Sequence, residues 1–190
     1  MTANPNPPKI SAGERIIMLM IQRLCEENQL KSKTVDFIMD MVEQNHLWAL
    51  SVKFPALPNW CASDPEYNET CDILDMWHIL GLSYERLPQN DKAIIDGQFG
   101  KDACLFPGFD IRSEGRHFDI ADVLQNKLQR YVNVKSCDAS RPLQSLGPIL
   151  ENHRRALPVY KSKWSEVVHS SKDTFNASDI KDILSAWYPK

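Results

Sequence analysis

The chain has 190 residues, of which 43% are hydrophobic, and this content is enough to bury a substantial core in one domain. Its formal net charge of −3 and its pI near 5.9 give no overall attraction to nucleic acid, so only a local basic patch could support such binding. The sequence contains no run of about 18 apolar residues, which excludes a transmembrane helix and membrane insertion by that route.

Residues 1–10 contain three prolines and no hydrophobic segment of the kind found in secretory signals. We expect residues 1–10 to be a disordered lead and residues 11–190 to form a single domain. The five cysteines are odd in number, lack a Cys-x-x-Cys pair and have no zinc-module spacing. They indicate reduced, structural thiols and therefore a cytoplasmic protein.

The first half of the chain predicts three helices. Apolar residues recur at three- and four-residue spacing over 12–29, and Ser11 with Glu14 forms a capping box at the start. A second helix is predicted over 34–52, ending before Pro55 because the residue that precedes proline disfavours helical backbone. A loop with three prolines occupies 54–65, and a third helix is predicted over 66–87.

The second half predicts a short helix over 91–95, a turn at 106–110 and a long fifth helix over 111–134. Further helices are predicted over 143–156, 159–170 and 179–187, the last of them capped by Ser178. No alternating pattern typical of strands is present. The prediction is an all-α fold, a single multi-helix domain of about seven helices. Its core is expected to contain Leu74, Trp77, Leu80, Phe118 and Leu128.

Two segments resemble the YfbU-like family of bacterial proteins. The run ILDMWHIL at 73–80 is similar to the central helix of that family, and PGFD at 107–110, followed by Glu114, is similar to its next segment. Weaker similarity at both ends extends the resemblance over nearly the whole chain after residue 10. The resemblance implies an all-helical, cytoplasmic, oligomeric protein from a family without an established activity, and it supplies no catalytic residues.

Four of the five histidines follow an Asp or Glu by three residues, and two of these pairs, Asp75/His78 and Glu114/His117, have apolar neighbours. On a helix such a pair lies on one face and could offer an oxygen and a nitrogen to one metal ion. Two facing pairs would form a divalent-metal site between the third and fifth predicted helices, suited to a metal-assisted enzyme. The alternative is that each pair is a surface ion pair and the protein needs no cofactor.

The densest polar group in the sequence includes Asp110, Glu114 and His117. One hypothesis is a ligand or metal pocket at a helix N-terminus, where free N–H groups favour an anion. The simpler interpretation is that Asp110 caps the fifth predicted helix and Glu114 stabilises its first turn.

Residues 141–164 carry five basic side chains and one acidic side chain, a local net charge of +4. Tyr160 and Trp164 lie among them, and such a pattern could bind single-stranded nucleic acid. A solvated face beside two core aromatic residues explains the pattern equally simply, and we consider nucleic acid an unlikely partner. The candidate contacts are Arg154, Arg155, Lys161 and Lys163.

Phosphate-binding loops, nucleophile elbows and zinc-protease motifs are absent from the sequence. We therefore predict a helical interaction or regulatory protein that acts as a homo-oligomer and can bind a protein partner. Helices containing residues 16–25 and 179–187 are candidates for packing against a second copy. A metal-assisted enzyme and a weak nucleic-acid binder are the alternative functions.

Overall fold

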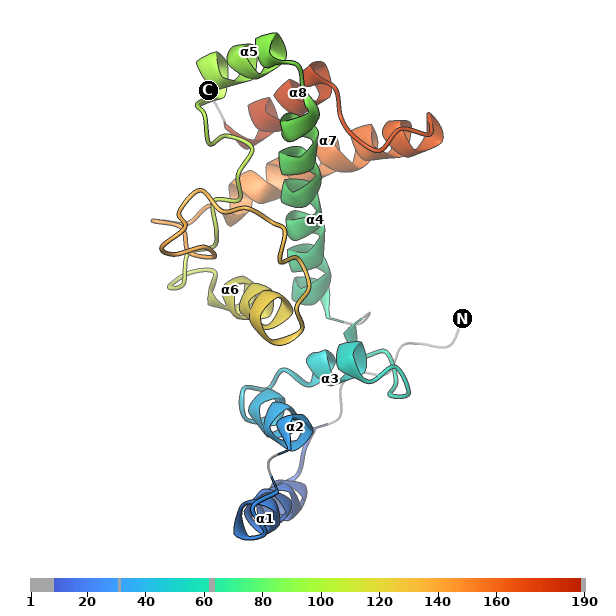
Figure 1. The fold of residues 1–190 in the computed structure, drawn as a ribbon, viewed down its shortest axis with the longest axis vertical. Helices are drawn as coiled ribbons and strands as arrows, with labels where there is room; N and C mark the ends of the chain where they lie inside the picture. The colour runs from blue at the N-terminus through green and yellow to red at the C-terminus, as the bar shows by residue number, and fades with distance from the viewer. Residues whose placement is uncertain (1–8, 31, 62–63, 189–190) are drawn as a thin grey trace. The chain divides into compact units, whose positions relative to one another are not determined.

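The computed structural model describes residues 9–30, 32–61 and 64–188 (Figure 1). Within these ranges the chain forms eight α-helices and one π-helix, and no strand, which confirms the predicted all-α class. The sequence predicts a single domain over 11–190, and the structure divides the chain into two compact units, residues 1–68 and 69–190.

The first unit contains α1 (Ala12–Glu27), α2 (Lys33–Glu43) and α3 (Leu47–Lys53). The capping box predicted at Ser11 and Glu14 is present at the start of α1. The single helix predicted over 34–52 is wrong, because Asn45 adopts a left-handed φ of 59° and separates α2 from α3. Asparagine tolerates this conformation better than most residues, and the break lets both short helices bury apolar side chains.

The second unit contains α4, which runs from Pro65 to Arg86 across the boundary between the units, α5 (Gln89–Phe99), α7 (Leu150–His169) and α8 (Ala177–Trp187). Both α5 and α7 contact α8. The Trp77 ring of α4 lies edge-on to the Trp187 ring of α8, with centroids 5.7 Å apart. The predicted core residues Leu74, Trp77 and Leu80 are buried at the centre of this arrangement.

The long fifth helix predicted over 111–134 is replaced by two shorter elements. The helix α6 covers Gly115–Asp122 and continues into the π-helix η2 (Val123–Lys127). Beyond η2, Gln129 and Tyr131 have left-handed φ values of 55° and 57°, which end the helical path. Phe118 and Leu128, expected in the core, are half-buried because this shorter element has a different buried face.

The C-terminal helices also differ from the sequence prediction. The two helices predicted over 143–156 and 159–170 are one helix, α7, which contains Pro158 in its interior. Proline destabilises a helix interior by about 3 kcal/mol, but α7 buries side chains on both sides of Pro158, and this packing compensates for it. The last helix begins at Ala177, and its cap is Asn176 rather than Ser178.

The chain between α5 and α7 is largely irregular outside α6 and η2. Two isolated parallel bridges hold this region together: Phe106 pairs with Ser136, and Phe109 pairs with Gln144. Both phenylalanines are buried, at 1% and 0% exposure. The bridges therefore fix the PGFD segment, predicted as a turn, against two later parts of the chain.

Candidate functional site

The PGFD turn is built around Gly108, which has a φ of +90°. A Cβ atom at this position would lie 2.5 Å from the carbonyl carbon of Gln144 and 2.7 Å from backbone atoms of Leu143 and Ser145. These neighbours are backbone atoms and cannot rotate away. The turn therefore requires glycine both for its backbone conformation and for its space.

The carbonyl oxygen of Gly108 contacts the imidazole of His153, a fully buried residue of α7. His153 Nε2 lies 3.3 Å from this oxygen, while Nδ1 lies 3.1 Å from Trp77 Nε1 and 3.2 Å from Trp187 Nε1. Since each indole N–H can only donate, Nδ1 is the acceptor and Nε2–H donates to Gly108. The imidazole is therefore neutral, and its burial lowers the pKa of His153 to about 4.

Glu114 has a role that the sequence did not predict. Its carboxylate accepts hydrogen bonds from the backbone N–H groups of Ile149 and Leu150, both at 2.6 Å, and from that of Asp110 at 2.8 Å. Ile149 is the N-cap residue of α7 and makes no side-chain cap of its own. Glu114 is 5% exposed, so this buried carboxylate caps a helix 35 residues further along the chain.

The Asp110 side chain accepts hydrogen bonds from residues two and three positions further along the chain. Its carboxylate accepts from the Ser113 hydroxyl at 2.5 Å and from the backbone N–H groups of Ser113 and Arg112 at 3.3 and 3.4 Å. The hydrogen bond from the Ser113 hydroxyl lowers the pKa of Asp110. Asp110 therefore stabilises the turn that precedes α6, and it is not the N-cap of that helix, whose N-cap is Glu114.

His117, the partner of Glu114 in the sequence pattern, points to a different group. Its Nε2 lies 2.8 Å from Glu69 Oε2, and Glu69 also accepts from the Arg154 guanidinium at 2.8 and 2.9 Å. Arg154 lies 2.7 Å from Glu151 as well. The paired guanidinium of Arg154 lowers the pKa of Glu69. These four side chains join α4, α6 and α7 in one hydrogen-bonded network.

The second sequence pair, Asp75/His78, lies on α4. Burial of the Asp75 carboxyl group raises its pKa, although the hydrogen bond that it accepts from Tyr131 acts in the opposite direction. His78 instead lines a pocket. In the described part of the chain, no group of three His, Cys, Asp or Glu side chains is placed to hold a metal ion. The geometry therefore gives no support to the hypothesis of a metal-assisted enzyme.

The basic side chains of α7 face acidic or amide partners contributed mainly by other elements. Besides Arg154, Arg155 contacts Asn152 at 2.5 Å and Lys161 contacts Asp72 at 2.5 Å. Lys163 lies 3.1 Å from Asp179 and 2.9 Å from Asp182 of α8. The positive charge of residues 141–164 is thus largely neutralised in the folded chain, a fact that a count along the sequence cannot reveal.

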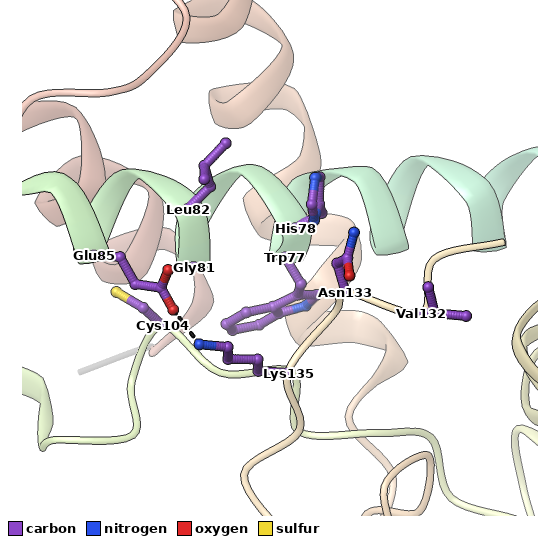
Figure 2. A pocket seen from close by; sticks show the side chains of 9 residues that line it. All are labelled: Trp77, His78, Gly81, Leu82, Glu85, Cys104, Val132, Asn133 and Lys135. Atoms are coloured by element: carbon purple, nitrogen blue, oxygen red, sulfur yellow. Dashed lines mark hydrogen bonds and ion pairs between the residues drawn. The ribbon is translucent and has the colours of Figure 1, made fainter.

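A pocket of about 400 Å³ lies between α4 and residues 132–135. Figure 2 shows Trp77, His78 and Glu85 of α4 beside Asn133 and Lys135, with an ion pair between Glu85 and Lys135. Cys104, which also lines the pocket, is buried, and this burial raises its pKa to about 12. The thiolate is the reactive form of cysteine, and burial disfavours the thiolate of Cys104.

The most unusual surface belongs to α1, a 16-residue helix that buries none of its residues. Its half-buried side chains, Met18, Gln22 and Cys25, recur at helical spacing and share one face. The large apolar side chains that remain exposed are Ile16 (57%), Ile17 (58%), Leu19 (52%), Met20 (61%), Ile21 (48%) and Leu24 (56%). These six side chains spread over more than half of the circumference of α1, outside the half-buried face, and we call this set the α1 apolar face.

Sequence reasoning selected Glu114, His117 and Arg154 but not the partners that they contact in the structure, and it missed the central position of His153. One signal for His153 was available. Ile149, Ala156, Leu157 and Tyr160 lie three, four or seven residues from His153, which places the imidazole on the apolar stripe of a helix. The partners Glu69 and Gly108 could not be found in this way, because both are distant in the sequence.

The apolar residues of α8, the other helix expected to pack against a second copy, are used within the chain. Ile180, Ile183, Leu184 and Trp187 are all buried, and α8 contacts α7 and α5. Among the described residues, none of the helices is both long and apolar enough to cross a membrane.

A comparison with known families agrees with the resemblance noted in the sequence. The family model of the YfbU domain matches residues 19–186, which is most of the chain. The match covers α4, the PGFD turn, Glu114 and His153, the residues on which the contacts described above depend. The chain belongs to the YfbU family.

Proposed function

We propose that this protein is an interaction or regulatory protein that acts as a homo-oligomer through the α1 apolar face, in the cytoplasm. The observation that carries the proposal is that α1 buries no residue while exposing six large apolar side chains. A helix of this length is only marginally stable in water by itself, and helices in proteins gain most of their stability by packing an apolar face. The α1 apolar face therefore needs a partner.

The size of this face suits a subunit interface. Six aliphatic side chains that each expose about half of their surface provide roughly 600 Å² of apolar area, whereas a standard interface buries about 800 Å² per partner. Leu30, just beyond the end of α1, is 64% exposed and extends the apolar area. Contiguous apolar surface of this extent is uncommon on monomeric proteins and typical of interaction sites.

A second copy of the chain is the partner that best fits the charges. In an antiparallel pair of α1 helices, the end with Glu14 and Arg15 would face the end with Arg23 and Glu27, which form an ion pair within the helix. The Glu14 and Arg15 end carries one acid and one base, so no excess of like charge opposes the pairing. The antiparallel arrangement also opposes the two helix dipoles. A two-fold interface uses the same surface on both copies, so the α1 apolar face would serve both partners.

The test is the molar mass of the full chain in solution, by light scattering at tens of micromolar. The expected result is a dimer or larger oligomer that dissociates on Ile17→Lys, because this change places a charge in the α1 apolar face. The matched control is Glu26→Gln, which changes the net charge by the same amount on an exposed polar position and should leave the oligomer intact.

Two outcomes would contradict the proposal. A monomeric wild-type chain with rapidly exchanging α1 amides would mean that the face has no partner of its own kind. A monomeric chain with protected α1 amides would mean that another part of the same chain covers the face.

A further inference from the structure

We propose that the pocket between α4 and residues 132–135 binds a free α-amino acid that has an apolar side chain. All of its lining residues lie in the second compact unit, so this proposal does not depend on the α1 apolar face. The pocket volume of about 400 Å³ lies in the range of small-molecule sites.

The charges around the pocket favour a zwitterion over other ligands. Glu85 and Lys135 carry the full charges of the lining and form an ion pair, so the pocket as a whole is nearly neutral. A phosphate-bearing ligand would need an excess of positive charge, and a divalent cation would need several carboxylates. A molecule that carries one ammonium and one carboxylate group matches one acid and one base.

The Glu85–Lys135 ion pair can open to accept such a ligand. The two side chains are 50% and 66% exposed, so solvent screens their attraction and little stability is lost when they separate. The ligand ammonium group would then pair with Glu85, and its carboxylate would pair with Lys135. This exchange replaces one ion pair with two.

The wall of the pocket includes apolar side chains: Leu82 and the exposed Val132 line it beside Trp77, which is 2% exposed and offers only the edge of its ring. Trp77, Gly81 and Glu85 recur every four residues and so share one face of α4. Figure 2 shows the Trp77 ring projecting from this face towards Lys135. The indole N–H is held by His153 at 3.1 Å, so the ring has a fixed orientation before any ligand arrives.

Gly81 keeps the pocket open. A Cβ atom at this position would meet only the carbonyl oxygen of Cys104, at the ordinary contact distance of 3.6 Å, so packing does not require glycine. Glycine is a poor residue for a helix interior, yet Gly81 lies inside α4, before its last turn. Its effect is to leave room beside Trp77 that any longer side chain would fill.

The experiment screens the full-length protein against the proteinogenic α-amino acids at millimolar concentration by ligand-observed NMR, followed by calorimetric titration. The expected result is binding of apolar amino acids. The amine that lacks the carboxylate and the acid that lacks the amino group should each bind about tenfold more weakly or worse, because each loses one of the two ion pairs.

Two variants locate the binding site. Gly81→Leu fills the pocket and should abolish binding, whereas Gly97→Leu, at an exposed position of α5 with no atom near its Cβ, should not. Lys135→Gln removes the partner of the ligand carboxylate without filling the pocket and should weaken binding about tenfold. Far-UV circular dichroism checks that each variant is folded.

Each of three results would overturn the proposal. The first is the absence of binding by any amino acid at millimolar concentration. The second is binding that survives Gly81→Leu or Lys135→Gln in a folded variant. The third is equal affinity for an amino acid and its decarboxylated amine, which would show that Lys135 does not recognise a carboxylate.

Discussion

Gly108 and His153 are the two residues on which the packing of the PGFD turn depends. Gly108 allows the turn to approach residues 143–145, and its carbonyl oxygen accepts from the imidazole that also accepts from two tryptophans. The turn is therefore a structural element of the core, held in place by tight packing.

Replacing Gly108 by alanine should destabilise the protein severely, by about 3 kcal/mol or more, because its Cβ would overlap backbone atoms and because alanine disfavours a φ of +90°. Gly97→Ala is the matched control. It lies in a helix with open space around it and should stabilise the protein by up to about 1 kcal/mol. Urea unfolding measures both changes. Equal effects of the two substitutions would contradict the role given to Gly108.

The neutral state of His153 makes stability depend on pH. The pKa of His153 in the folded protein is about 4, below its ordinary value of 6.5, so the unfolded chain binds more protons between these values. The free energy of unfolding therefore falls as the pH drops from about 6.5 towards 4, because His153 must stay neutral in the folded chain. The total loss from this one residue is about 3 kcal/mol at most. Urea unfolding at several pH values measures the loss.

NMR of the His153 imidazole separates this effect from the titration of carboxylates in the same range. The ring should remain neutral at pH 5, with the proton on Nε2. A His153 that titrates near its ordinary pKa would contradict the assignment.

At the scale of elements, α7 depends on a cap that comes from another part of the chain. Glu114→Ala should destabilise the protein by about 2–4 kcal/mol, because it leaves backbone N–H groups of Ile149 and Leu150 without their acceptor. The control Glu151→Ala removes an exposed glutamate from the first turn of α7 and should cost about 1 kcal/mol or less. Thermal unfolding compares them. A similar loss in both variants would mean that Glu114 contributes only charge near the helix end.

The basic side chains of the helix α7 are the ones that would bind nucleic acid under the alternative function. Since Arg154, Lys161 and Lys163 are paired with carboxylates, we expect no binding to single- or double-stranded probes at low salt in an anisotropy assay. Binding that weakens with salt, and weakens further when Arg154 and Arg155 are replaced by alanine, would show that these ion pairs open for a nucleic acid.

At the scale of the whole molecule, an oligomer formed through the α1 apolar face should make thermal stability depend on concentration. A hundredfold increase in protein concentration should raise the wild-type Tm by roughly 2–4 °C, because mass action stabilises only the associated folded state. The Tm of Ile17→Lys should not change with concentration. Calorimetry at two concentrations measures the difference, and a wild-type Tm independent of concentration would contradict association through α1.

Much of this molecule could be predicted from local sequence. The all-α class, the Ser11–Glu14 capping box, the extent of α4 and the membership of the YfbU family were all available, because helical periodicity, caps and family motifs are read within short windows. The buried set Leu74, Trp77 and Leu80 followed from the same periodicity, since residues three and four apart share one face of a helix.

Only the tertiary structure decided where helices break and what the polar residues do. Asn45 separates α2 from α3 within a segment whose apolar periodicity predicts one continuous helix, whereas Pro158 lies inside the continuous helix α7. In both cases burial of the neighbouring side chains outweighs the local helix propensity. Glu114 caps a helix far along the chain, and His117 pairs with Glu69, because hydrogen bonds between elements depend on how the elements pack. Such contacts leave no periodic signal in the sequence, so they could not be predicted from it.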